Sequence, residues 1–253
     1  MPHFKITLAY DGSEFVGWQR QPAGTSVQGV VEDALAVLDG RQVSAMGASR
    51  TDAGVHALGQ VAGVTLERDI DGPALVRALN ARLPAAVRVI EAIDVPHTFH
   101  ARFDASAKTY RYRIWNHEVL DPFERFGVWH VPAPRLDLDA MDTAARLFEG
   151  RHDFVAFQAT GAVTTSTERS VFSSRVRNVP ARLGGPRDVV EYEVRGDGFL
   201  RHMVRTMVGT LIEVGRGRQE AAWISRVIAE KERANAGRTA PACGLFLVAV
   251  HYE

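Results

Sequence analysis

Apolar and polar residues follow two distinct periods along the first part of the chain. Apolar and more polar residues alternate with a period of two over 4–10, which is typical of a half-buried strand. Apolar residues then recur at helical spacing over 27–38, and this pattern predicts a helix with a capping box at Thr25 and Gln28 and a stop at Gly40. Further patterns predict strands over 42–48, 58–66 and 87–95 and a helix over 73–82. The predicted order is β-α-β-β-α-β, that of a ferredoxin-like unit.

The rest of the chain repeats this order with longer connections and without sequence similarity between the halves. Alternation predicts a strand around Tyr110, Tyr112 and Ile114. The later elements are a helix over 138–149, strands over 168–179 and 188–195 around a turn at 183–186, helices over 199–214 and 220–231, and a strand over 245–252. We therefore predict an α+β protein with two ferredoxin-like halves, 1–104 and 105–253. A mixed, mainly antiparallel sheet with helices packed on one face would join them.

Composition places the chain among ordinary globular proteins. Hydrophobic residues make up 46% and charged residues 24% of its 253 residues. No apolar run approaches the length of a membrane span, and the N-terminus does not resemble a signal peptide. The single cysteine, Cys243, fits a reducing compartment, and no metal-ligand spacing occurs. We expect a cytoplasmic protein without a membrane segment or a metal.

The positive charge is concentrated although the formal net charge is zero. Lysine occurs only at Lys5, Lys108 and Lys231, so 27 of the 30 basic residues are arginine. Two clusters stand out: Arg102, Lys108, Arg111 and Arg113, and then Arg195, Arg201, Arg205, Arg216 and Arg218. Guanidinium groups suit phosphate and stack on bases, which favours an RNA partner. A codon bias toward arginine would explain the same composition.

The helix over 199–214 and the loop around Asp52 hold the candidate chemistry. Six apolar residues of the helix fall on one arc of roughly 140°, with Arg205 at its edge. A partly covered guanidinium needs an anionic partner. Arg205 therefore either forms a structural salt bridge or holds a catalytic carboxylate or a phosphate. Asp52 lies in a glycine-containing loop. It is either a turn former or the carboxylate that Arg205 holds. His56 is either a general base or a hydrogen-bonded filler.

Tyr110 lies between basic residues at the start of its predicted strand. An aromatic ring interleaved with positive charge suits stacking on an RNA base. Tyr110 and Tyr112 share a face with Ile114, so both rings are equally explained as core. The residues alone indicate a two-halved protein with an acidic site and basic stripes, and they do not name a reaction.

Six segments together resemble the tRNA pseudouridine synthase A family, the tRNA pseudouridine(38–40) synthases. They are YDGSEFVGWQRQ (10–21), SVQGVVEDAL (26–35), RTDAGVHALGQV (50–61), FHARFDASAKTYRYRI (99–114), GFLRHMVRTMVGTLIEVG (198–215) and GLFLVAV (244–250). They occur in the family's order and span nearly the whole chain. The resemblance implies a homodimer that uses no metal or organic cofactor. It also implies isomerisation of uridine to pseudouridine at positions 38, 39 and 40 of the tRNA anticodon stem-loop.

The resemblance also assigns roles to residues of this chain. Asp52 is the nucleophile, Arg205 pairs with Asp52, and Tyr110 stacks on a flipped-out uracil. Leu245 lines the pocket, and Arg50 organises the site or holds RNA. The expected RNA contacts are Gln19, Arg20, His56, Arg111 and Arg201. One departure is Ser49, where the family usually has glycine.

Two other functions use the same features. A non-catalytic RNA-binding module would keep the ferredoxin-like halves and basic clusters and would not need Asp52. A hydrolase with Asp52 and His56 as an acid–base pair would release a free base or a cut phosphodiester, and it would fail when His56 is replaced.

Overall fold

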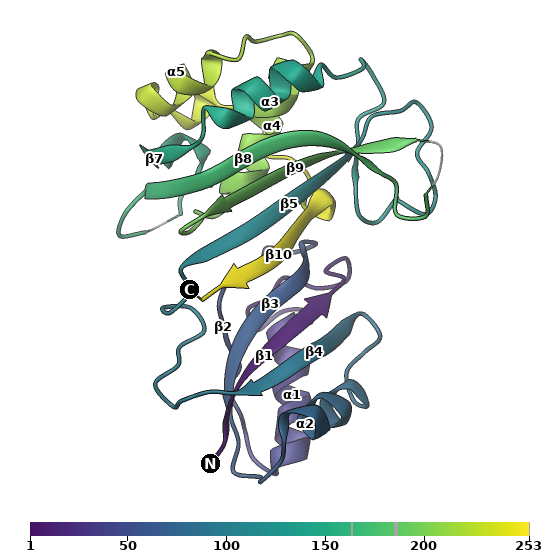
Figure 1. The fold of residues 1–253 in the computed structure, drawn as a ribbon, viewed down its shortest axis with the longest axis vertical. Helices are drawn as coiled ribbons and strands as arrows, with labels where there is room; N and C mark the ends of the chain where they lie inside the picture. The colour runs from purple at the N-terminus through teal and green to yellow at the C-terminus, as the bar shows by residue number, and fades with distance from the viewer. Residues whose placement is uncertain (163, 185–186, 253) are drawn as a thin grey trace. The chain divides into compact units, whose positions relative to one another are not determined.

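The computed structural model describes residues 1–162, 164–184 and 187–252 and confirms the predicted α+β class (Figure 1). The chain divides into two compact units, which we describe separately. Unit 1 comprises Met1–Ser106 and Phe246–Glu253, and unit 2 comprises Ala107–Leu245. Part of the turn predicted at 183–186 lies outside the described residues. Among the described residues, no helix has both the length and the apolar character needed to cross a bilayer.

Unit 1 has the predicted β-α-β-β-α-β order. Its elements are β1 (His3–Tyr10), α1 (Val27–Asp39), β2 (Met46–Gly47), β3 (His56–Thr65), α2 (Gly72–Asn80) and β4 (Val87–Asp94). β1 lies between β3 and β4 and pairs antiparallel with both, while β2 pairs antiparallel with β3. The alternation predicted for β1 is observed, because every second side chain from Phe4 to Tyr10 is buried. α2 packs on β4 and α1 packs beside α2.

The last strand belongs largely to unit 1, which corrects the predicted division at residue 105. We assigned all of 105–253 to the second half, whereas β10 (Leu245–His251) pairs parallel with β3, with Phe246 opposite His56. The apolar pattern of 245–252 correctly predicted a strand. That pattern does not specify which strand is the partner, because pairing between segments so far apart in the chain depends on tertiary contacts.

Unit 2 is built on a second antiparallel set of strands. Its sheet elements are β5 (Ala107–Trp115), β6 (Trp129–His130), β7 (Gly150–Asp153), β8 (Glu168–Pro180) and β9 (Asp188–Gly196). The strand order is β5-β9-β8-β7, with β6 parallel to β5. The helices are α3 (Leu138–Arg146), α4 (Met203–Gly215) and α5 (Trp223–Glu230). α3 packs on β8, α4 packs on β5, and the two helices contact each other, so both cover one face.

Three of the differences between expected and observed element boundaries bear on the candidate site or have a clear local cause. The N-cap of α1 is Ser26, whose hydroxyl accepts from the Gly29 amide, and not Thr25. The strand predicted over 42–48 shortens to Met46–Gly47, the two residues that pair with β3. α4 begins at Met203 because His202 adopts a left-handed conformation with φ 65°, so the helix predicted from residue 199 starts later. Arg201 therefore lies in a turn before the helix.

Candidate functional site

Backbone contacts with segment 15–18 hold the loop that carries Asp52. Asp52 is half-buried and forms an isolated antiparallel bridge with Gly17. The Trp18 amide donates to the Thr51 carbonyl at 3.1 Å, and the Gly54 amide donates to the Phe15 carbonyl at 3.3 Å. The position of the predicted nucleophile is therefore fixed by main-chain contacts, and none of these contacts uses its carboxylate.

Gly17 allows this close approach. Its φ is +107°, and a Cβ added there would lie 2.5 Å from the Thr51 carbonyl oxygen. Gly17→Ala should therefore strain the backbone and push the two segments apart, at a cost of about 1–3 kcal/mol. We expect the Trp18 and Gly54 amides to exchange with deuterium at least about tenfold faster in this variant. Gly40→Ala is the matched control, since Gly40 has φ +75° and open space around it. Unchanged exchange at both amides in Gly17→Ala would contradict this account of the loop.

Side chains behind the loop complete its support. The Tyr10 hydroxyl lies 2.8 Å from the Thr51 hydroxyl, and the Tyr10 ring lies beside buried Trp18. Fully buried Gln60 donates to the Ser49 carbonyl at 2.7 Å. Among the described residues, the non-glycine residues with positive φ are His202 and Lys231. Ser49 therefore does not have the positive φ at which glycine would be preferred, and serine fits this position without backbone strain.

His56 is buried at the start of β3. Its Nδ1 lies 3.1 Å from the Gly12 amide nitrogen and 3.1 Å from Asp11 Oδ1, and its ring stacks on Phe246 at 4.6 Å. Burial raises the pKa of Asp11, but hydrogen bonds from Ser13 and the neighbouring His56 outweigh it and lower this pKa overall. These partners favour a structural role, and the RNA contact and acid–base role of His56 stay predictions.

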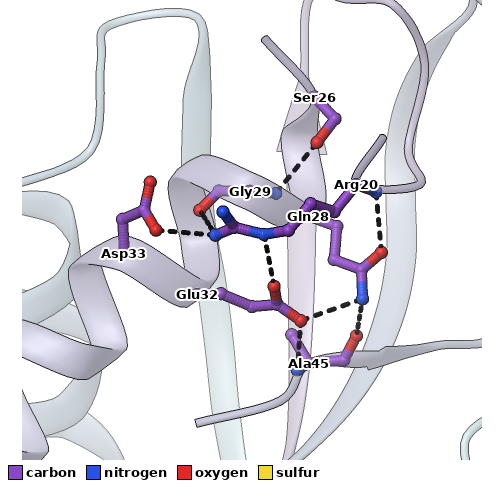
Figure 2. A network of polar contacts seen from close by, with 7 residues as sticks. All are labelled: Arg20, Ser26, Gln28, Gly29, Glu32, Asp33 and Ala45. Carbon is purple, nitrogen blue, oxygen red and sulfur yellow. Dashed lines mark hydrogen bonds and ion pairs between the residues drawn. The ribbon is translucent and has the colours of Figure 1, made fainter. Parts of the chain in front are cut away.

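The remaining candidates of unit 1 are exposed, and one of them joins an extensive network. Gln19 and Arg50 have exposed side chains. Figure 2 shows the Arg20 guanidinium directed onto α1, where it contacts Glu32 at 2.8 Å, Asp33 at 2.6 Å and the Gly29 carbonyl at 2.9 Å. Arg20 thereby ties the segment after Trp18 to α1. These contacts favour a structural role for Arg20, and its contact with RNA stays a prediction.

Glu32 is the centre of that network (Figure 2). Its carboxylate also accepts from Gln28 Nε2 at 2.9 Å and from the Ala45 amide at 3.1 Å. Glu32 is buried, so these donors compensate for the loss of water around its charge. The network connects α1, the segment before β2 and the segment that contacts the Asp52 loop.

Tyr110 and Leu245 are both buried within unit 2. Tyr110 pairs with Val194 across β5 and β9, and its ring meets Phe199 edge-on at 5.1 Å. Nearby Tyr112 donates its hydroxyl to the Pro241 carbonyl at 2.7 Å, and burial raises the pKa of Tyr112. Leu245 follows the 3₁₀ turn Ala242–Gly244 directly. The core interpretation of the two tyrosines is consistent with this burial, and stacking of Tyr110 on uracil stays a prediction.

Arg205 is half-buried on α4 and bonded to the segment before that turn. Its Nε donates to the Ala240 carbonyl at 2.7 Å, and its own carbonyl accepts from the Ala240 amide at 3.0 Å. The predicted partial burial of Arg205 is observed, as is burial of the apolar positions from Leu200 to Leu211. Asp52 belongs to unit 1 and Arg205 to unit 2, and their pairing stays a prediction.

Glutamates of β9 contact Arg111 of β5 and Arg177 of β8. Arg111 contacts Glu191 at 3.1 Å and Glu193 at 2.8 Å, while Arg177 of β8 contacts Glu191 at 2.7 Å. The sequence indicated local positive charge because these acids lie on a strand much further along the chain. The RNA contact of Arg111 stays a prediction.

Arg201 is placed differently, at a cavity that it shares with Arg233 and Arg238. Arg233 and Arg238 are not among the candidate residues that the sequence indicated. Their only local signal is the segment RANAGRTA (233–240), which interrupts the apolar patterns before the last strand. No group of three or more His, Cys, Asp or Glu side chains in the described ranges is placed to hold a metal ion.

Comparisons with known proteins agree on one family. Its sequence model, described as tRNA pseudouridine synthase, matches residues 6–104 and 144–253. A protein named tRNA pseudouridine synthase A from Solibacter usitatus is 47% identical over all of this chain and all of its own length. Proteins of the same name are 45% identical in Myxococcus xanthus, covering 100% of this chain and 93% of that protein, and in Limosilactobacillus fermentum, covering 100% and 97%. A solved structure, "Crystal Structure of a Cbf5-Nop10-Gar1 Complex", matches 83% of this chain and 45% of that chain at 13% identity, and its TM-score of 0.37 supports no conclusion.

Proposed function

Because this chain belongs to the tRNA pseudouridine synthase family, a family of isomerases, we propose that it converts uridine to pseudouridine at positions 38, 39 and 40 of the anticodon stem-loop. The observation that supports this most is the full-length similarity to proteins named tRNA pseudouridine synthase A. The ranges that the family model matches contain Asp52, Arg205 and Leu245, whereas Tyr110 lies between them. A cytoplasmic location and a homodimer belong to the same proposal.

The reaction exchanges one bond to the ribose for another. In the proposed route the Asp52 carboxylate attacks ribose C1′, and the electron pair of the C1′–N1 bond leaves with uracil. The detached ring turns, its C5 bonds to C1′, and the C1′–carboxylate bond breaks. The hydrogen on C5 leaves as a proton and N1 is protonated, so uridine and pseudouridine are isomers. A glycal route, in which the carboxylate assists loss of a ribose proton, gives the same product.

Each assigned side chain meets a requirement of this chemistry. Asp52 must be ionised to attack, and the Arg205 guanidinium favours the anion by its charge. The detached uracil must not diffuse away, so Tyr110 provides an aromatic face and Leu245 an apolar wall. The target nucleotide must first leave its stack, which costs a few kcal/mol. Arginine contacts to RNA phosphates supply that free energy, so binding should weaken as salt rises.

A tRNA transcript labelled with tritium at uracil C5 tests the proposal. Formation of the C1′–C5 bond expels the label into water, so the protein should release tritium from a transcript with uridine at positions 38, 39 and 40. The same transcript with cytidine at those three positions should release none. Release from the cytidine transcript would contradict the position assignment. Binding without release from several tRNAs would favour an RNA-binding module, and release of free base would favour a hydrolase.

A further inference from the structure

A cavity of about 520 Å³ in unit 2 carries positive charge that no bond-making or bond-breaking step above uses. Its wall includes Arg201, Arg233 and Arg238, together with His202 and Thr160, and no aspartate or glutamate is among the described residues that line it. The volume lies in the range of small-molecule sites, enough for a phosphate and an adjoining sugar. All of the lining residues belong to unit 2.

Among the described residues, the three guanidinium groups have no acidic partner, in contrast to several other arginines of unit 2. Arg111, Arg113 and Arg177 each contact a glutamate. Within the described ranges, no carboxylate oxygen lies within ion-pair distance of Arg201, Arg233 or Arg238. Three like charges around one cavity repel one another, so the arrangement favours an anionic ligand.

Desolvation of Arg233 strengthens this preference. Its side chain is half-buried and donates to the Gly237 carbonyl and the Thr239 hydroxyl, both at 3.0 Å. Burial lowers the pKa of Arg233, which means that the charged form is poorly solvated. An anion in the cavity would restore the interactions that this charge loses on burial.

Arg238 is held over the face of Trp129 and is still exposed. Its guanidinium carbon lies 4.8 Å from the centre of the Trp129 ring. Stacking fixes the plane of a guanidinium and leaves its edge N–H groups available for a bidentate contact. Arg201 is also exposed, and its main chain is fixed because its carbonyl accepts from the Ala159 amide at 2.9 Å.

The wall of the cavity is anchored to α4, so the arginines are presented by a rigid support. Gly209 lets segment 237–239 lie directly on the helix, because a Cβ at Gly209 would be 1.7 Å from the Arg238 carbonyl oxygen. The Gly237 amide also donates to the Thr210 hydroxyl at 3.0 Å. α4 begins at the cavity with no side-chain cap, so the positive end of the helix dipole adds to the field.

We propose that the cavity formed by Arg201, Arg233 and Arg238 binds a backbone phosphate of the tRNA substrate. Only the choice of RNA as the molecule that carries the bound phosphate rests on the proposed function. Ala240, which directly follows segment 237–239, is hydrogen-bonded to Arg205. Phosphate binding at the cavity would therefore fix the substrate backbone beside the chain segment that holds a predicted active-site residue.

Salt-dependent binding of unmodified tRNA transcript tests this site. Arg201→Gln and Arg238→Gln avoid the hydrogen bonds within the wall that Arg233 makes. We expect the double variant to bind about tenfold more weakly at ~0.1 M salt. The slope of log Kd against log salt should fall by about one, because one phosphate contact is lost. Arg226→Gln is the matched control, since Arg226 is an exposed arginine of α5 paired with Glu220, and it should keep the wild-type slope.

An unchanged slope and affinity in the double variant would overturn the inference. The variant must first be shown to be folded by its melting temperature. If the wild type releases tritium in the same experiments, this outcome leaves the proposed function intact and removes only the site. If the wild type releases no tritium, the proposed function is contradicted, and the binding site is still tested by the affinity and the salt slope.

Inorganic phosphate offers the same chemistry as an RNA phosphate, so its effect on the melting temperature is measured in parallel. We expect it to stabilise the wild type and not the double variant, with tRNA binding weakened by the same substitutions. Stabilisation of the wild type alone, with equal tRNA binding by both proteins, would show that the cavity binds a small anion and not RNA.

Discussion

Asp52→Asn should reduce tritium release from labelled tRNA by about 10⁴-fold, because replacing a nucleophile that forms a covalent intermediate removes the reaction path itself. Asparagine has nearly the same volume and cannot carry the negative charge that attacks C1′ in the proposed route. The loop should keep its structure, since Asp52 is held by its main-chain bridge to Gly17. The measurement is single-turnover tritium release at saturating enzyme, together with the affinity for the transcript.

Asp69→Asn provides the control for this variant. Asp69 is an exposed aspartate of the same unit, and its replacement changes net charge by the same amount without touching the loop. It should release tritium at the wild-type rate. Asp52→Asn activity within about tenfold of wild type, with normal binding, would exclude Asp52 as the nucleophile. Equal loss in both variants would indicate a general effect of charge.

Glu124→Ala should cause a large loss of stability in unit 2. Glu124 contacts Arg113 at 2.7 Å, and their side chains are 2% and 8% exposed. Its other carboxylate oxygen accepts from the Arg182 amide at 2.7 Å. Removing the carboxylate leaves a buried guanidinium without its anion, which costs about 3–5 kcal/mol. The melting temperature should fall by roughly 10 °C, as measured by calorimetry.

Glu220→Ala is the control, because it breaks the exposed pair with Arg226 and should cost less than about 1 kcal/mol. Equal melting temperatures for Glu124→Ala and Glu220→Ala would contradict the buried-pair argument.

The same pair predicts how stability depends on pH. Burial raises the pKa of Glu124, but the hydrogen bonds from Arg113 and the Arg182 amide outweigh burial, and this pKa is lowered overall. A folded-state pKa below the unfolded one gives stability that is present above the unfolded value, near 4.3, and lost as the pH falls through the folded value. Glu124→Ala should therefore lose less stability than wild type below about pH 5. A steeper loss of stability at acid pH in the variant than in the wild type would contradict the direction of this pKa shift.

Local sequence determined the elements of this protein and the place of its candidate nucleophile. The alternation in β1 and the helical spacing in α1 are local, since each depends on which face of one element is apolar. Gly40 ends α1 in a left-handed conformation, as its position after the last apolar residue predicted. The RTDAGVHA string placed Asp52 in the loop before β3, and the structure has it there.

Tertiary structure decided the partners of these elements and of their charges. The last strand was predicted from its apolar residues, but only its pairing with β3 assigned it to unit 1. Arg111 looked available for RNA in the sequence, and the acids that contact it come from β9, a strand distant in the chain. Arg201 and Arg238 are likewise distant in sequence and meet at one cavity. Sequence specifies how a segment folds through local periodicity, whereas the environment of a charge depends on which distant segments fold against it.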